Sequence, residues 1–368
     1  MSASIASPAA RTAQGQPNAD AVTGGARVSI MDDMAMIRAA SELTRDLVAP
    51  RPAVYWADFL GSAFVGYAAL YGAIAIGTIW LALGAALVSI LALYRAGSFI
   101  HEVTHIKHSA VPGFRLGFNV VVGIPLLVPS FMYEGVHSLH HARMRYGTVD
   151  DPEYLPLALM KPWTVPLFVA VSSLAPIALL FRYGVLTPLS LLIPPLRTVV
   201  VERYSGLVIN PQFRRRPAEG ALRRIWKVQE AAACLWALAL VTMVATGVFP
   251  IRAFLIALGI TSGTLVLNQV RTLVAHLWEN DGGVITTTAQ FLDSVNVPPP
   301  NRLSGLWAPV GLRYHATHHL LPGLPYHALG EAHRRLREAL PQDSQYHGAS
   351  YTGLPVLVTR LVSGAAKA

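Results

Sequence analysis

The sequence is short of charge. Only 13% of its 368 residues are Asp, Glu, Lys or Arg, while 53% are hydrophobic. A typical soluble domain carries about 25% charged residues. So few charges cannot cover a soluble globule of this size, which excludes the ordinary soluble classes. The composition predicts a chain whose solvent is a lipid bilayer.

Cysteine is almost absent as well. Cys234 is the single one, which excludes an intrachain disulfide and any cysteine-based metal cluster. It stands in an apolar run and is predicted to pack as a small hydrophobic residue.

The first residues lack the apolar core of a cleaved signal peptide. Residues 1–30, rich in Ala, Ser, Gly and polar residues, are predicted to be a disordered tail. Residues 31–50 are predicted to form an amphipathic helix at the membrane interface.

Basic residues outnumber acidic ones, 29 to 20, and they are clustered. No nucleic-acid motif accompanies them, so we expect no nucleic-acid partner. Lys and Arg beside apolar spans usually mark the cytoplasmic face and its anionic lipid. One cluster is Arg214, Arg215, Arg216, Arg223, Arg224 and Lys227, and another is Arg334, Arg335 and Arg337.

Long uncharged runs locate the membrane spans. A hydrocarbon core about 30 Å thick needs about 20 helical residues, and no charge occurs between Asp58 and Arg95. That run predicts a helical hairpin, and a second one follows later. The expected spans are 55–74 with 76–96, and 231–247 with 253–270.

The stretch 163–200 is ambiguous, because it contains Arg197 and is interrupted by Pro188, Pro194 and Pro195. It predicts either two more spans or a hairpin lying in the membrane. The prediction is therefore an all-α membrane protein with four to six transmembrane helices. If 163–200 enters and leaves on one side and the basic loop 203–227 is cytoplasmic, residues 97–162 and 271–368 are cytoplasmic too.

The sequence is rich in paired histidines on that side. On a helix, residues three and four apart share a face, so each histidine cluster aims several imidazoles one way. HEVTHIKH contains His101, His105 and His108, HSLHH contains His137, His140 and His141, and HATHH contains His315, His318 and His319. His276 follows the last span, in VAHLWEN.

These imidazoles predict a metal site. One transition-metal ion takes at most about six ligands and a zinc ion about four, so eight or nine imidazoles fit two ions. Imidazole suits Fe, Zn, Cu and Ni, and ligand number alone does not choose between them. HEVTH by itself also matches the zinc-protease motif HExxH.

The order HxxxH, HxxHH, HxxHH around paired spans resembles the integral-membrane fatty acid desaturase family over roughly residues 55–340. HHARMRYGTVDDPEYLP resembles the stretch after that family's second box, HHLLPGLPYHALGEAHRRL the tail of its third box, and VAHLWEN the site of its additional histidine ligand. The first box has the three intervening residues of the acyl-lipid branch. Thr272 stands where the acyl-CoA branch carries a ligand-associated Asn.

The resemblance implies a four-span fold whose cytosolic cap holds a di-metal centre of two non-haem irons. Residues 51–340 would form this membrane desaturase-like domain and 341–368 a C-terminal tail. The implied ligands are His101, His105, His137, His140, His141, His276, His315, His318 and His319, with His108 as an addition that the family pattern does not place.

Four acids are candidate partners for the outer ring nitrogens of these histidines, since a ligating His usually donates its other N–H to a carboxylate. Glu102 lies off the face of His101 and His105 and is predicted to serve an imidazole of another box. The other three candidates are Asp150, Asp151 and Glu153. The alternative for each acid is a solvated surface charge.

The implied activity is O2-dependent desaturation of an acyl chain, which we expect to be lipid-linked, by an enzyme of a bacterial inner membrane whose active site faces the cytoplasm. Because a fold does not decide a reaction, a hydroxylase or a carotenoid ketolase of the same superfamily is the alternative. An intramembrane zinc protease using HEVTH and a haem-binding electron carrier are more remote.

The chemistry also needs two electrons from outside. The sequence contains no HPGG-type cytochrome b5 segment, so the expected donor is a separate ferredoxin or cytochrome b5-type protein. The basic surface around Arg214, Arg215 and Arg216 would either steer an acidic donor or contact lipid headgroups.

Overall fold

The computed structural model describes residues 30–367, which form helices joined by turns and loops. The predicted disordered tail, 1–30, lies outside the described residues except for Ile30. Extended pairing in the described part is limited to isolated bridges. The α-helices are α1 Met34–Leu43, α2 Pro52–Ala75, α3 Ile79–His105, α4 Phe114–Phe118, α5 His137–His140, α6 Thr164–Ala170, α7 Ala175–Phe181, α8 Thr187–Leu192, α9 Pro194–Tyr204, α10 Gly220–Ala245, α11 Ile251–Leu273, α12 Thr287–Asp293, α13 Ser304–Trp307, α14 His315–Leu320, α15 Leu329–Ala339 and α16 Leu354–Ala365.

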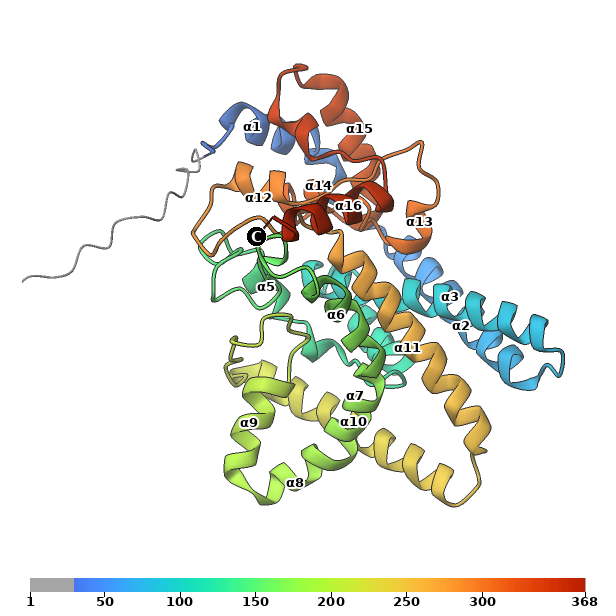
Figure 1. Cartoon of the computed structure of the whole chain (residues 1–368). Coiled ribbons are helices and arrows are strands. Elements are labelled where there is room, and N and C mark those ends of the chain that lie inside the picture. Colours follow the sequence, from blue (N-terminus) through green and yellow to red (C-terminus); the bar gives the residue numbers. More distant parts are fainter. Residues whose placement is uncertain (1–29, 368) are drawn as a thin grey trace, which may run out of the picture.

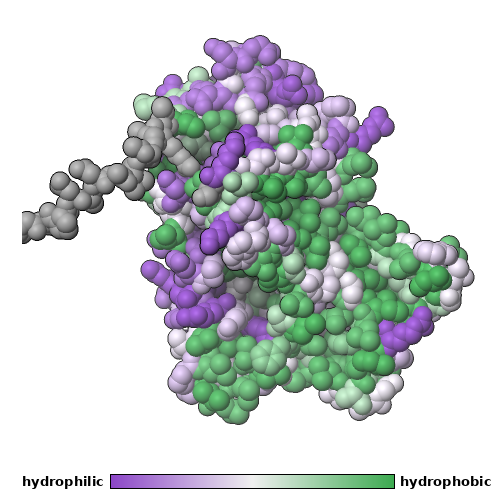
Figure 2. Space-filling view, in the orientation of Figure 1, coloured by the Kyte–Doolittle hydropathy of each residue, from purple (hydrophilic) through white to green (hydrophobic). Residues whose placement is uncertain are grey.

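Five helical stretches in the described residues are long and apolar enough to cross a membrane: α2, α3, α10, α11 and the run 164–192. The prediction of an all-α membrane protein with four to six spans is confirmed. The hairpin of α2 and α3 extends away from a compact cap built around the histidine segments, and α10 and α11 lie outside the cap and diverge from the turn that joins them (Figure 1). The surface is hydrophobic over the long helices and hydrophilic over much of the cap (Figure 2).

Helix α3 is longer than its predicted span 76–96. It continues to His105, so the first histidine box occupies the last turns of a membrane helix. An aromatic cluster packs beside this end, with Tyr55 and Phe59 from α2, Phe99 from α3 and Phe114 from α4. Their rings meet mostly edge to face, at centroid separations such as 5.3 Å for Phe59 and Phe114. This packing holds the end of α3 in place relative to α2.

The ambiguous stretch 163–200 resolves into a path that leaves the cap and returns to it. Helices α6, α7 and α8, joined by a 3-10 turn and the π-helical segment Arg182–Leu186, form one run of 29 residues. Helix α9 then turns back. The following loop contacts the second-box region, where Ile209 N donates to Pro152 O at 2.8 Å and the Asn210 side chain donates to Val149 O at 2.9 Å. The stretch therefore enters and leaves at one end of the molecule, as the sidedness argument required.

The cap packs against the predicted interfacial helix, residues 31–50, and against part of the predicted C-terminal tail, residues 341–368. Met36 and Ala40 of α1 are fully buried against Phe291 and Leu336 of the cap. The amphipathic helix expected at the membrane interface thus has its apolar face covered by protein. The expected C-terminal tail also carries structure, because Leu361 of α16 packs in one cluster with Tyr154 and Leu157.

Candidate metal centre

Nine histidines converge in the cap and divide into two groups. Within each group, the candidate ligand atoms lie within 4.8 Å of one another. The first group is His101, His105, His137, His141 and His318, and the second is His140, His276, His315 and His319. These are the nine residues that the sequence suggested as ligands. The rings of His141 and His319, one from each group, are 4.3 Å apart, so the groups are neighbours.

Helical spacing explains why each of the two HxxHH boxes serves both groups. In HSLHH and HATHH, the fourth residue lies about 60° from the first on one side of the helix and the fifth about 40° from it on the other. His137 and His141 therefore fall in the first group while His140 falls in the second. In the third box His315 and His319 share the second group, and His318 joins the first. Each HxxHH box therefore contributes to both groups, whereas the first box contributes only to the first group.

The separations fit ligands converging on shared ions. Two nitrogens each about 2.1 Å from one ion and at right angles are about 3.0 Å apart. The Nε2 atom of His141 lies 3.0 Å from that of His137 and 3.1 Å from that of His318. The Nε2 atom of His315 lies 3.1 Å from that of His276 and 3.2 Å from that of His319.

Two further ring nitrogens support this fit. The Nε2 atoms of His101 and His105 are buried and have no hydrogen-bond partner in the described residues. A buried polar atom without a partner costs free energy, and a metal bond to each nitrogen would remove that cost.

Burial keeps these rings in the form that binds metal. It lowers the pKa of His141, His276, His315, His318 and His319 well below 6.5, and the neighbouring imidazoles lower it further. The neutral imidazole is the ligating form, so at neutral pH no imidazolium proton has to be removed from these rings first.

Two of the four candidate acids accept hydrogen bonds from the Nδ1 atoms of candidate ligand histidines. Asp151 is fully buried and accepts from His140 Nδ1 at 3.0 Å, while Glu153 accepts from His137 Nδ1 at 3.1 Å. Burial, the largest single effect, lowers the pKa of His140, but the charge and hydrogen bond of Asp151 together with the charges of Glu153 and Asp293 outweigh it, and the pKa is raised. Both contacts leave Nε2 of the ring free for a metal.

The other two candidates behave differently. Asp150 is exposed, and the described contacts of its side chain include no histidine. Glu102 lies 3.4 Å from Nδ1 of His101 in its own box rather than from an imidazole of another box. Its other oxygen accepts from the Tyr55 hydroxyl of α2 and from Tyr326 N at 3.1 Å. Glu102 therefore ties α3 to α2 and to the segment after the third box.

His108, the additional histidine of the first box, is outside both groups. Its side chain is 45% exposed and contacts Arg115 at 3.0 Å. One of the arginines expected to face an electron donor is also placed elsewhere. Arg215 is buried and donates to the carbonyl oxygens of Phe131 and Glu134, so it joins the loop to the cap instead of offering its charge to a partner.

Sequence reasoning missed two residues that contact the second group, Tyr146 and Arg271, and a third, Asp293, that contacts Tyr146. His276 Nδ1 donates to the Tyr146 hydroxyl at 2.8 Å, and that hydroxyl donates to Asp293 at 2.7 Å. Arg271 Nη2 donates to His315 Nδ1 at 3.2 Å. The spacing of Tyr146 and Asp293 carried no signal, because they lie 130 and 17 positions from His276. In the sequence, Arg271 is a charged residue at the end of an apolar span, and nothing there indicated a contact with His315.

Comparison with known proteins agrees with this geometry. The family model described as "Fatty acid desaturase" matches residues 78–351. The chain belongs to the fatty acid desaturase family. It is 52% identical over 322 residues to a protein of Caulobacter vibrioides (strain NA1000 / CB15N) named "Ceramide hydroxylase", an alignment that covers 88% of this chain and 92% of that one. No solved structure matches.

The family settles the class of the protein. This desaturase family member is a membrane oxidoreductase, as the histidine boxes predicted. The zinc protease suggested by HEVTH is not supported, since His101 and His105 belong to a five-histidine group. The relative's name favours the hydroxylase alternative over the acyl desaturase that the boxes first suggested.

Proposed function

We propose that the protein is an O2-dependent hydroxylase of ceramide or of a closely similar lipid. The observation that carries the proposal is the 52% identity, over nearly the full length of both chains, to a protein named as a ceramide hydroxylase. Desaturation of an acyl chain is the second candidate, because the family model carries that description.

The reaction would replace one C–H bond of the lipid with C–OH. One oxygen atom of O2 enters the product and the other leaves as water, which consumes two electrons and two protons. An aliphatic C–H bond has no acidic proton, so acid–base groups alone cannot activate it. A bound pair of redox metals, proposed here to be iron, supplies the reduction of O2 that this step requires.

The chain's own residues would hold and orient that pair. We assign the nine histidines of the two groups as ligands, with five on one ion and four on the other. Asp151 and Glu153 fix the tautomers of His140 and His137 by accepting from Nδ1. Tyr146, itself hydrogen-bonded to Asp293, would fix the tautomer of His276 by accepting from its Nδ1.

His315 needs a separate account. Arginine only donates hydrogen bonds, so Nδ1 of His315 accepts from Arg271 and a neutral His315 carries its proton on Nε2. Binding of Nε2 to a metal would require loss of that proton. The adjacent positive charge of Arg271 would favour the deprotonated ring.

Electron supply and orientation follow from the same arrangement. We propose that the cap faces the cytoplasm of a bacterial inner membrane and that a separate ferredoxin or cytochrome b5-type protein delivers the electrons there. The basic residues near α10 and α15 are consistent with a cytoplasmic cap.

Lipid profiling would test the reaction. The protein would be expressed in a ceramide-containing bacterial host, and its lipids compared by mass spectrometry with those of a host carrying His140→Ala or His318→Ala. A new ceramide heavier by one oxygen atom, labelled when labelled O2 is supplied, is the expected result. A ceramide or acyl chain lighter by two hydrogen atoms would instead favour desaturation. Product formation by either variant would contradict the ligand assignment.

A further inference from the structure

A second site lies away from the histidines, between α9 and α10. A cavity of about 260 Å³ is lined by Arg197, Thr198, Val201, Glu202, Pro217, Ala218, Arg223, Trp226 and Lys227. The spacing explains the site, because 197, 198, 201 and 202 share one face of α9, while 223, 226 and 227 share one face of α10. Pro217 and Ala218, from the loop between the helices, close one side.

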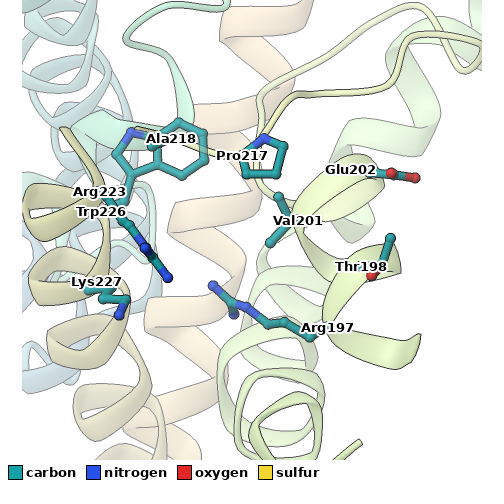
Figure 3. Close-up of a pocket in the computed structure, with 9 residues that line it drawn as sticks. All are labelled: Arg197, Thr198, Val201, Glu202, Pro217, Ala218, Arg223, Trp226 and Lys227. Atoms are coloured by element: carbon teal, nitrogen blue, oxygen red, sulfur yellow. The ribbon is translucent and has the colours of Figure 1, made fainter. Parts of the chain in front are cut away.

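Three cations point into this space. The end groups of Arg197, Arg223 and Lys227 gather around the cavity, whereas the carboxylate of Glu202 points away from them (Figure 3). Arg197 is already paired with Glu230, at 2.7 Å. The side chains of Arg223 and Lys227 make no ion pair and no hydrogen bond with the described residues. The cavity therefore has two positive charges that the described residues leave uncompensated, which suits an anion.

Trp226 provides a rigid wall for this cavity. The guanidinium of Arg215 stacks on its ring, 3.9 Å from the ring centroid, and the same guanidinium is held by carbonyl oxygens of the cap. The α10 side of the cavity is thus fastened to the cap. Tryptophan is also enriched where a membrane protein meets the lipid headgroups.

The surroundings of the cavity are apolar and exposed. On α10, Leu222 is 51% exposed and Val228 is 63% exposed, and Leu192, just before α9, is 80% exposed. Helix α10, Gly220–Ala245, is one of the helices long and apolar enough to cross a membrane. The cations therefore stand at the boundary between a polar cap and surface that lipid chains would cover.

We propose that this cavity binds the phosphate of an anionic phospholipid headgroup, with the acyl chains lying along the exposed apolar residues of α9 and α10. Arg223 and Lys227 would contact the phosphate directly, and Arg197 would contribute from the opposite helix. A soluble phosphate compound offers the same charge but would leave the adjoining apolar surface without an occupant. This proposal does not rest on the hydroxylase reaction.

Native mass spectrometry of the whole protein in detergent would test the site. Phosphatidylglycerol and phosphatidylcholine would be titrated separately into wild type, Arg223→Gln, Lys227→Gln and the double variant. Each basic residue near an anionic lipid surface contributes about 1 kcal/mol, so we expect affinity for phosphatidylglycerol to fall about fivefold in each single variant and roughly thirtyfold in the double one. Phosphatidylcholine should bind more weakly than phosphatidylglycerol to wild type.

Arg224→Gln is the matched control. It removes the same charge from the next position of the same exposed helix end, but Arg224 does not line the cavity, and lipid retention should stay at the wild-type level. If the double variant retained phosphatidylglycerol as well as wild type does, the proposed lipid site at this cavity would be wrong. If millimolar inorganic phosphate displaced the lipid, the ligand of the cavity would be a soluble phosphate compound, and the proposal that it is a phospholipid would be wrong. Because binding needs no turnover, both results are independent of whether the protein hydroxylates ceramide.

Discussion

Asp151 shows how one buried acid can serve a metal site that it does not touch. Its side chain is completely buried, and its two oxygens accept from His140 Nδ1 and from the backbone N–H groups of Gly147 and Glu153. These bonds hold the carboxylate in position, so that it can fix the ring of His140 with Nε2 toward the other histidines of the second group.

Replacing Asp151 with Asn should therefore weaken metal binding. The amide lacks the negative charge that holds the Nδ1 proton, and loss of such an outer partner typically costs about 10–100-fold in metal affinity. Metal analysis after competition with a graded chelator would measure the loss. Asp150→Asn is the control, since Asp150 is exposed and its neighbour carries the contact. Equal metal retention by Asp151→Asn and wild type would contradict the assignment.

Sequence spacing predicted the histidines better than it predicted their partners. The HxxxH and HxxHH patterns place histidines three and four residues apart, so eight of the rings could be paired from local spacing, while His276 and the ligand assignment came from the resemblance to the family. Asp151 and Glu153 were candidates because they follow the second box closely. Tyr146 could not be found in this way, because its contact with His276 joins positions 130 residues apart and depends on how the cap closes.

At the scale of helices, α2 and α3 approach each other closely enough to exclude a side chain. A Cβ atom on Gly66 would lie 2.6 Å from Leu93 Cδ2 and 3.1 Å from Leu93 N. The Ser89 hydroxyl donates to Gly66 O at 2.9 Å. Small residues that let helix backbones come close are typical of membrane helix pairs, where packing rather than hydrophobic burial drives association. Since α3 ends in the first histidine box, this contact also helps to position His101 and His105.

Gly66→Val should destabilise the protein. Forcing a larger side chain into a packed helix interface costs about 1–3 kcal/mol, and the branched side chain here would meet α3 directly. A lower thermal unfolding temperature in detergent would show the cost. Gly61→Val is the matched control on the same helix, because a Cβ atom on Gly61 meets nothing within 4 Å. An equal effect of both substitutions would attribute the loss to helix propensity instead of the α2–α3 contact.

Helix prediction succeeded where apolar runs were long and failed where packing decides the outcome. The run between Asp58 and Arg95 can only form a hairpin in a bilayer, and it does. The charge of Arg197 left 163–200 ambiguous, because nothing local showed that Glu230 of α10 would pair with it. The segment after residue 340 was assigned to a tail for a similar reason, since the apolar residues of α16 find their partners almost 200 positions earlier.

At the scale of the whole molecule, folding buries a large set of titratable groups in the cap. Burial lowers the pKa of nine histidines outside the spans: His108, His137, His141, His276, His315, His318, His319, His327 and His333. Three groups shift the other way. Burial raises the pKa of Glu153 to about 7 and of Asp293 to about 6, and Asp151 raises that of His140 despite its burial.

The metal-free protein should consequently lose stability in mild acid. Below about pH 6.5 the unfolded chain protonates histidines that the folded chain keeps neutral, so the free energy of unfolding falls as pH falls. Glu153, Asp293 and His140 bind protons more tightly when folded and oppose this trend, but the nine histidines outnumber these three groups. Thermal unfolding of chelator-treated protein between about pH 7.5 and about pH 5.5 would measure the slope. A stability that rises toward acid pH would mean that these imidazoles are not buried together as the fold requires.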